Sequence, residues 1–112
     1  MTTEQVATMI AGVGLPYAYD HFEPEEAPGN PPFICFFYGQ TDDLYADDGN
    51  YAAVWPLYIE LYTDNKDFDM EARVEAALAA AEQPWQKSKT EYIESERMYQ
   101  TTYNTEVLIT NA

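Results

Sequence analysis

The first apolar repeat of the chain predicts a short helix near the N-terminus. The residues that follow the i, i+3, i+4, i+7 spacing of one buried helical face are Val6, Met9, Ile10 and Val13. Thr2 precedes this stretch and Gln5 follows three residues later, a pair typical of the capping box that begins a helix. Gly14 and Pro16 then end the repeat, so we expect only about two to three turns.

A second helix is predicted between residues 67 and 82. Asp67 is a suitable N-cap, and the carboxylates of Asp69 and Glu71 in the first turn favour the helix dipole. The apolar stripe of this helix is Met70, Val74, Ala77, Leu78 and Ala81. Because the alanines permit close approach, we expect the stripe to pack on a sheet that contains residues 33–37.

Three further stretches are predicted to be strands. Residues 33–38 form a continuous apolar run, which is typical of an interior strand with both faces buried. Residues 51–62 carry large uncharged side chains at odd positions, and Pro56 indicates a bulge or an edge position there. Residues 85–93 and 97–109 are expected to form a C-terminal hairpin, the latter with its odd positions on one face.

These elements together predict an α+β fold in a single domain, residues 1–112. We expect a short N-terminal helix, an antiparallel-rich sheet with a long hairpin, one amphipathic helix packed on the sheet, and the C-terminal β-hairpin. Residues 16–22 are expected to be extended, and residues 23–32, with four prolines, to form a loop.

The long hairpin provides the candidate contact residues. Its tip, Asp47-Asp48-Gly49-Asn50, suits a turn that requires positive φ. We expect this hairpin to project from the subunit, as an arm that contacts a neighbour or as the lining of a lumen. The residues proposed as assembly contacts are Asp42, Asp43, Tyr45, Asp47, Asp48 and Tyr51.

Charge restricts the function further. The chain carries 20 acidic and 5 basic residues, a formal charge of −15, which argues against unaided binding to nucleic acid or to an anionic membrane. Residues 1–65 contain eleven acids and no lysine or arginine, so one surface is expected to be strongly negative. No apolar run approaches the ~20 residues of a membrane span, and no secretory signal is recognisable.

The residue pattern assembles no active site, so we expect neither an enzyme nor a bound cofactor or metal. His21 has no cysteine partner for zinc, and Cys35 lies in an apolar run where burial makes a thiol inert. Ser88 and Ser95 have no nucleophile motif around them. If Gly49 held the sixth position of a calcium loop, residues that cannot ligate would occupy the ligand positions.

Ten tyrosines leave two interpretations open. Tyrosine is favoured at protein–protein interfaces because it covers much area at low entropic cost. It is also simply a good strand residue. The sequence alone supports these two interpretations about equally.

Two sequence segments resemble those of a known protein family. They are Tyr58–Leu78, which joins a strand to the second helix, and Tyr92–Val107 in the final hairpin, with Gly14–Tyr17 and Pro32–Ile34 upstream. Over residues 10–108 the chain resembles small prophage proteins encoded among the head–tail joining genes of siphophages of Gram-positive-type bacteria. In element order it is similar to tail terminators, also called tail-completion proteins.

This resemblance implies a structural role in bacteriophage virion assembly. Tail terminators form a hexameric ring that caps the tail tube and presents a surface to the head connector, so the implied partners are further copies of the chain, the tail tube protein and head connector proteins. The implied location is the virion, and the host cytoplasm during assembly. An acidic lumen would let DNA pass without binding it. The alternative is an acidic DNA mimic that inhibits a nuclease or another DNA-binding protein.

Overall fold

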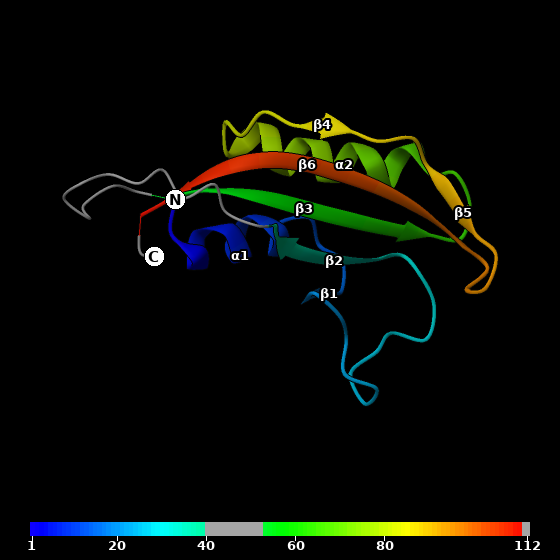
Figure 1. Cartoon of the computed structure of the whole chain (residues 1–112). Coiled ribbons are helices and arrows are strands. Elements are labelled where there is room, and N and C mark those ends of the chain that lie inside the picture. Colours follow the sequence, from blue (N-terminus) through cyan, green and yellow to red (C-terminus); the bar gives the residue numbers. More distant parts are fainter. Residues whose placement is uncertain (40–52, 111–112) are drawn as a thin grey trace.

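The computed structural model describes residues 1–39 and 53–110, and these residues form two helices and six strands. In chain order the elements are α1 (Thr3–Ala11), β1 (Tyr17–Tyr19), β2 (Phe33–Tyr38), β3 (Ala53–Thr63), α2 (Phe68–Ala80), β4 (Gln86–Lys87), β5 (Glu91–Ile93) and β6 (Met98–Ile109). The predicted α+β fold is confirmed, including the N-terminal helix and the C-terminal hairpin of β5 and β6 (Figure 1).

Both helices begin where the sequence predicts. The Thr2 side chain accepts a hydrogen bond from the Gln5 backbone N–H, and the Gln5 side chain accepts one from the Thr2 N–H, which completes the capping box. Asp67 caps α2 by accepting a hydrogen bond from the Met70 N–H at 3.1 Å.

The sheet has the strand order β1-β2-β3-β6-β4, and β5 also pairs with β6. β1 runs parallel to β2, while the other pairs are antiparallel. The long β3–β6 ladder, from Ala53↔Ile109 to Thr63↔Tyr99, forms the centre of the sheet. β1 and β4 therefore lie at opposite edges, which matters for assembly.

The expectation of a bulge or an edge position at Pro56 is wrong. Pro56 pairs with Glu106 inside the continuous β3–β6 register, and β3 lies between β2 and β6. Its carbonyl points toward the β2 side, where it accepts a hydrogen bond from the Gly39 N–H at 2.8 Å, just past the end of β2. Because the missing N–H faces the same way, the ladder with β6 loses no hydrogen bond.

The single strand predicted for residues 85–93 is two short strands instead. Between β4 and β5, the Ser88 hydroxyl accepts the Thr102 N–H at 3.1 Å, and the Ser88 N–H donates to the Thr102 carbonyl. A side chain thus replaces a backbone partner, and the regular pairing with β6 is interrupted.

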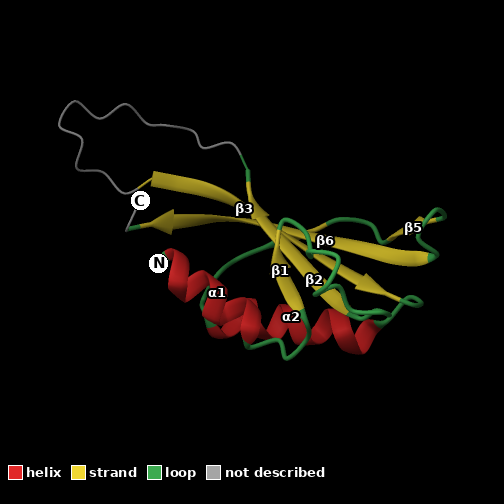
Figure 2. Cartoon of the chain, turned by 90° about the horizontal axis from the view of Figure 1, so that it is seen from below, coloured by secondary structure: helices red, strands yellow, loops and turns green. Residues whose placement is uncertain are grey.

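Both helices pack on the same face of the sheet (Figure 2). The core on that face combines Val6, Met9 and Ile10 of α1 with Val74 and Leu78 of α2. The strand residues in it are Leu57, Ile59 and Leu61 of β3 and Tyr103, Val107 and Ile109 of β6, all at odd positions. The expected packing of residues 33–37 on α2 is half right. Ile34 and Phe36 enter the core, whereas Phe33 and Phe37 point to the other face.

Arg73 also ties the middle of α2 to the segment that follows α1. The Arg73 guanidinium of α2 donates to the Val13 carbonyl after α1 at 2.8 and 3.1 Å. Gly14, with φ of +85°, lies so close that a Cβ there would be 2.6 Å from Arg73 Nη2. The positive φ therefore favours glycine at this position, and a Cβ there would also displace the Arg73 guanidinium.

In the described part of the chain, neither helix has the length and apolar character needed to cross a bilayer.

Candidate assembly surface

The contact residues nominated from the sequence cannot be placed. Asp42, Asp43, Tyr45, Asp47, Asp48 and Tyr51 all fall within residues 40–52, outside the described part of the chain. The structure instead directs attention to three other features: the face of the sheet opposite the helices, a hollow at one edge, and an acidic loop at the other.

The uncovered face of the sheet is the face opposite α1 and α2, and it carries paired aromatic rings. Phe33 stacks on Tyr62 with ring centroids 4.9 Å apart, and Phe37 stacks on Tyr58 at 5.2 Å. Phe22 adds an edge-on contact to Phe33. These rings are half-buried, and neither described helix covers them. The face thus presents apolar area to whatever packs there.

Between the two aromatic pairs lies a polar centre. The Tyr62 hydroxyl donates to one Glu60 oxygen at 3.1 Å, and Gln100 Nε2 donates to the other at 2.9 Å. Burial and the neighbouring Glu60 carboxylate raise the pKa of Tyr62 well above its usual range. The carboxylate is thus held by neutral donors, and the centre needs no bound ligand to satisfy it.

Cys35 opposes Glu60 in the β2–β3 register and is buried, as predicted. Burial, assisted by the Glu60 charge, raises the pKa of its thiol to about 11. The thiol is therefore protonated at neutral pH and is a poor nucleophile.

A hollow of about 610 Å³ opens on the uncovered face beside β4. We call it the edge hollow; its apolar lining is Pro56, Tyr58, Pro84 and Trp85, and its polar lining includes Gln86 and Asn104. A second, smaller hollow of about 300 Å³ adjoins it, shares Tyr58, Gln86 and Asn104, and reaches Lys87. Glu106 also lines the edge hollow, and aromatic rings and prolines beside amide groups suit a peptide segment better than an ion.

The opposite edge of the sheet carries residues 20–32, which we call the acidic loop. Its carboxylates are Asp20, Glu23, Glu25 and Glu26, all exposed. Tyr17 and Tyr19 of the adjoining β1 are 42% and 51% exposed, so this edge is aromatic as well as acidic. In Figure 1 the loop hangs below β1 and β2, on the side away from β4.

His21 lies within this loop, between two carboxylates. Its Nδ1 is 2.9 Å from Asp20 Oδ2, and its Nε2 is 3.3 Å from Glu23 Oε1. The hydrogen bond with Asp20 and the charge of Glu23 raise the pKa of the imidazole. All three side chains are exposed, and among residues 1–39 and 53–110 no cluster of histidine, cysteine or carboxylate groups could hold a metal ion.

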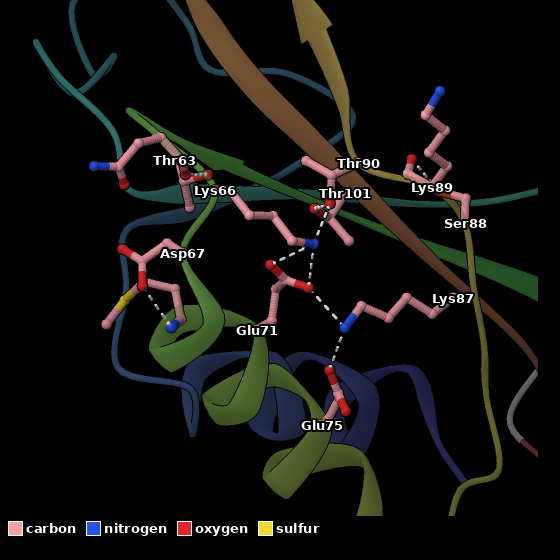
Figure 3. A network of polar contacts seen from close by, with 12 residues as sticks. Thr63, Lys66, Asp67, Glu71, Glu75, Lys87, Ser88, Lys89, Thr90 and Thr101 are labelled. Atoms are coloured by element: carbon pink, nitrogen blue, oxygen red, sulfur yellow. Dashed lines mark hydrogen bonds and ion pairs between the residues drawn. The ribbon is translucent and has the colours of Figure 1, made fainter.

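The basic residues are largely engaged inside the subunit. The carboxylate of Glu71, 3% exposed, lies between Lys87 Nζ at 2.6 Å and Lys66 Nζ at 3.0 Å (Figure 3). Lys87 also contacts Glu75 at 3.0 Å, and the Tyr103 hydroxyl donates to the same Glu75 oxygen at 2.8 Å. This network ties α2 to β4, β6 and the segment before α2, so these cations do little to offset the acidic surface.

Removing the Glu71 charge should destabilise the protein at neutral pH. Burial alone would raise the pKa of Glu71, but Lys87 and Lys66 outweigh it and hold the pKa below the usual 4.5. The ionised carboxylate therefore contributes stability above that pH and loses it as pH falls through the lower, folded value. We expect Glu71→Gln to lower the free energy of unfolding by about 1–3 kcal/mol at pH 7.

Urea unfolding of the variant and the native protein, at pH 7 and in steps below pH 4.5, measures this difference. The difference in free energy of unfolding between the variant and the native protein should become smaller as the pH falls. Glu94→Gln, in the exposed β5–β6 turn, removes the same charge without a described ion pair and should change stability by under ~0.5 kcal/mol. A Glu71→Gln variant as stable as this control would show that the network contributes nothing.

No match was found in the comparisons with protein-family models, curated proteins and solved structures.

Two features of this surface escaped the sequence reasoning. Tyr58 and Tyr62 are even-numbered residues of the alternating stretch 51–62 and so share one face, but their stacking partners depend on the register with β2. The edge hollow requires residues 56–58, 84–86 and 104–106 together, and nothing local to any of these segments indicates the others.

Proposed function

We propose that the chain is a virion morphogenesis protein, a structural subunit of the ring that completes a phage tail and joins it to the head. The observation that carries the proposal is the one-sided sheet. Two helices cover one face, while the other holds the stacked pairs Phe33/Tyr62 and Phe37/Tyr58 and the edge hollow. A subunit that assembles needs such an apolar surface for its neighbours.

The acidic surface supports the same role. With Lys66 and Lys87 bound to Glu71, and Arg73 bound to the Val13 carbonyl, three of the five basic side chains are held by internal contacts. A ring of such subunits would repel DNA from its wall and let it pass without adhering. Its partners would be further copies of the chain, the tail tube protein and head connector proteins.

The acidic loop favours a second candidate, a DNA mimic that occupies the basic groove of a nuclease. Four exposed carboxylates lie within residues 20–26, and mimicry of a phosphate backbone needs such a cluster. It also needs carboxylates spaced along one rigid face. Residues 20–26 follow β1 and belong to no strand or helix, so the mimic ranks second.

Mass in solution separates the two candidates. Sedimentation equilibrium over rising protein concentration should give a closed hexamer, six times the 12.8 kDa subunit. A compact monomer or dimer at all concentrations, which binds a cationic DNA-binding protein, would replace the ring proposal with the mimic. Tail tube protein added to the hexamer should co-sediment with it.

A further inference from the structure

We propose that the acidic loop of one copy binds in the edge hollow of the next copy, head to tail around the ring. This inference rests on the proposed function and names the contact that would close the ring. It assigns residues 20–32 as the inserted segment and the hollow beside β4 as its receptor.

The edge hollow has the chemistry of a groove for proline-rich chain. Tyr58 and Trp85 supply flat apolar surfaces, and Pro56 and Pro84 add rigid ones. Gln86 and Asn104 supply side-chain amides that can hydrogen-bond to the backbone of an inserted segment. Grooves lined by aromatic rings are a recurring type of binding site for proline-rich segments.

The chain itself holds a segment that matches. Four of its seven prolines, Pro24, Pro28, Pro31 and Pro32, lie in the acidic loop, and residues 23–27 are exposed throughout. Proline restricts the unbound loop, so less conformational entropy is lost when it docks. Residues 23–26 form a turn in which the Glu26 N–H donates to the Glu23 carbonyl at 2.9 Å, so the segment would enter the hollow as a compact, exposed loop tip.

Charge contributes to this contact through one exposed lysine. Glu23, Glu25 and Glu26 give the loop its negative charge, whereas Glu106 lines the edge hollow itself. Lys87, which lines the smaller hollow, is already paired with Glu71 and Glu75. Lys89 is exposed two residues further on, and among the described side chains it has no ion-pair partner (Figure 3). This stretch is the most basic part of an acidic chain, and it lies beside the hollow.

The placement of the two features suits a ring. The loop adjoins β1, and the hollow adjoins β4. These two strands lie at opposite ends of the strand order (Figure 1). A contact between different patches of identical subunits is heterologous, and it closes into a ring when the rotation permits. The alternative, a two-fold dimer through either feature alone, would leave the other feature unused.

A pair of variants at one position tests the receptor. Glu106 lines the edge hollow and is exposed. Glu106→Trp fills the hollow and removes one negative charge, whereas Glu106→Gln removes the same charge and leaves the space open. We expect Glu106→Trp to raise the concentration needed for assembly at least tenfold, while Glu106→Gln assembles as well as the native chain or better. Circular dichroism establishes that both are folded.

Engineered cysteines test the pairing directly. With Ala27→Cys in the loop and Gln86→Cys at the hollow, mild oxidation should link neighbouring copies into a ladder that ends at the hexamer on a non-reducing gel. The control pair, Ala27→Cys with Ala79→Cys on the exposed side of α2, should give no ladder. Native Cys35 is buried and does not interfere.

The outcomes distinguish this inference from the proposed function. If the native chain forms a hexamer but Glu106→Trp assembles like Glu106→Gln and the first cysteine pair gives no ladder, only the loop-in-hollow contact is wrong. If the native chain is monomeric at every concentration, the ring proposal fails and the contact fails with it. A ladder together with the selective loss in Glu106→Trp establishes the contact.

Discussion

Leu78→Ala should lower the free energy of unfolding by about 2–5 kcal/mol, the range for emptying a leucine site in a packed core. Leu78 is 1% exposed and lies in the core with Val74 of the same helix and Ile34 of β2. The cost combines lost burial of apolar area with the cavity left behind, since neighbours collapse only partly. Chemical denaturation, with the midpoint and slope both fitted, measures it.

The matched control is Leu108→Ala, the same change on β6. Leu108 is 52% exposed and lies outside the core cluster, so this variant should differ from the native protein by under ~0.5 kcal/mol. Equal effects of the two substitutions would mean that the stripe of α2 does not face the sheet.

The parts of the fold that the sequence predicts are those with local causes. The capping residues Thr2 and Asp67 sit at the starts of helices because they accept hydrogen bonds from N–H groups two or three residues ahead. The alternation of residues 101–109 survives because one face of β6 is buried along its length. Each of these causes lies within a few residues of its effect.

The errors in the sheet arise from partners far along the chain. Pro56 is harmless inside β3 only because β2 ends at Tyr38, one residue short of needing its missing N–H. The strand predicted at 85–93 breaks because Ser88 meets Thr102 across the sheet. Neither the end of β2 nor the Ser88–Thr102 register is visible from the local pattern.

The apolar run at 33–38 was predicted to be buried on both faces, and it is covered by helices on one. On the other face, Phe33 and Phe37 stack on Tyr62 and Tyr58 of β3 instead of packing under a helix. The two interpretations of the tyrosines, as interface residues and as ordinary strand residues, therefore both apply to these pairs. Tyr58 is a regular residue of β3, and it also lines the edge hollow.

The candidate site also divides into what a local pattern indicates and what depends on partners far along the chain. A run of aspartates drew attention to residues 42–51, which lie outside the described part of the chain. The edge hollow combines residues from three separate segments, so only the tertiary structure reveals it. Glu71 was assigned to the helix dipole, and its two lysine partners come from residue 66 and residue 87.

Ring assembly should be suppressed in dilute buffer and restored by salt. Each subunit carries −15, so a ring of six would carry −90. If neighbouring centres lie about 30 Å apart, near the 29 Å middle dimension of the subunit, their repulsion is ~30 kcal/mol in water without salt. Screening reduces it to ~11 kcal/mol at 0.01 M and ~1.5 kcal/mol at 0.1 M ionic strength.

Local attraction between the acidic loop and Lys89 works against this trend, but an exposed ion pair contributes only about 0–1 kcal/mol. The repulsion between whole subunits is larger at low salt, and the proline and aromatic contacts in the hollow respond little to salt. Sedimentation velocity from 0.01 to 1 M salt should therefore show the hexamer replacing monomer. A DNA mimic bound to a basic groove weakens as salt rises, because its complex depends on charge attraction. Rings that dissolve when salt is added would thus count against apolar closure and in favour of contacts held by charge.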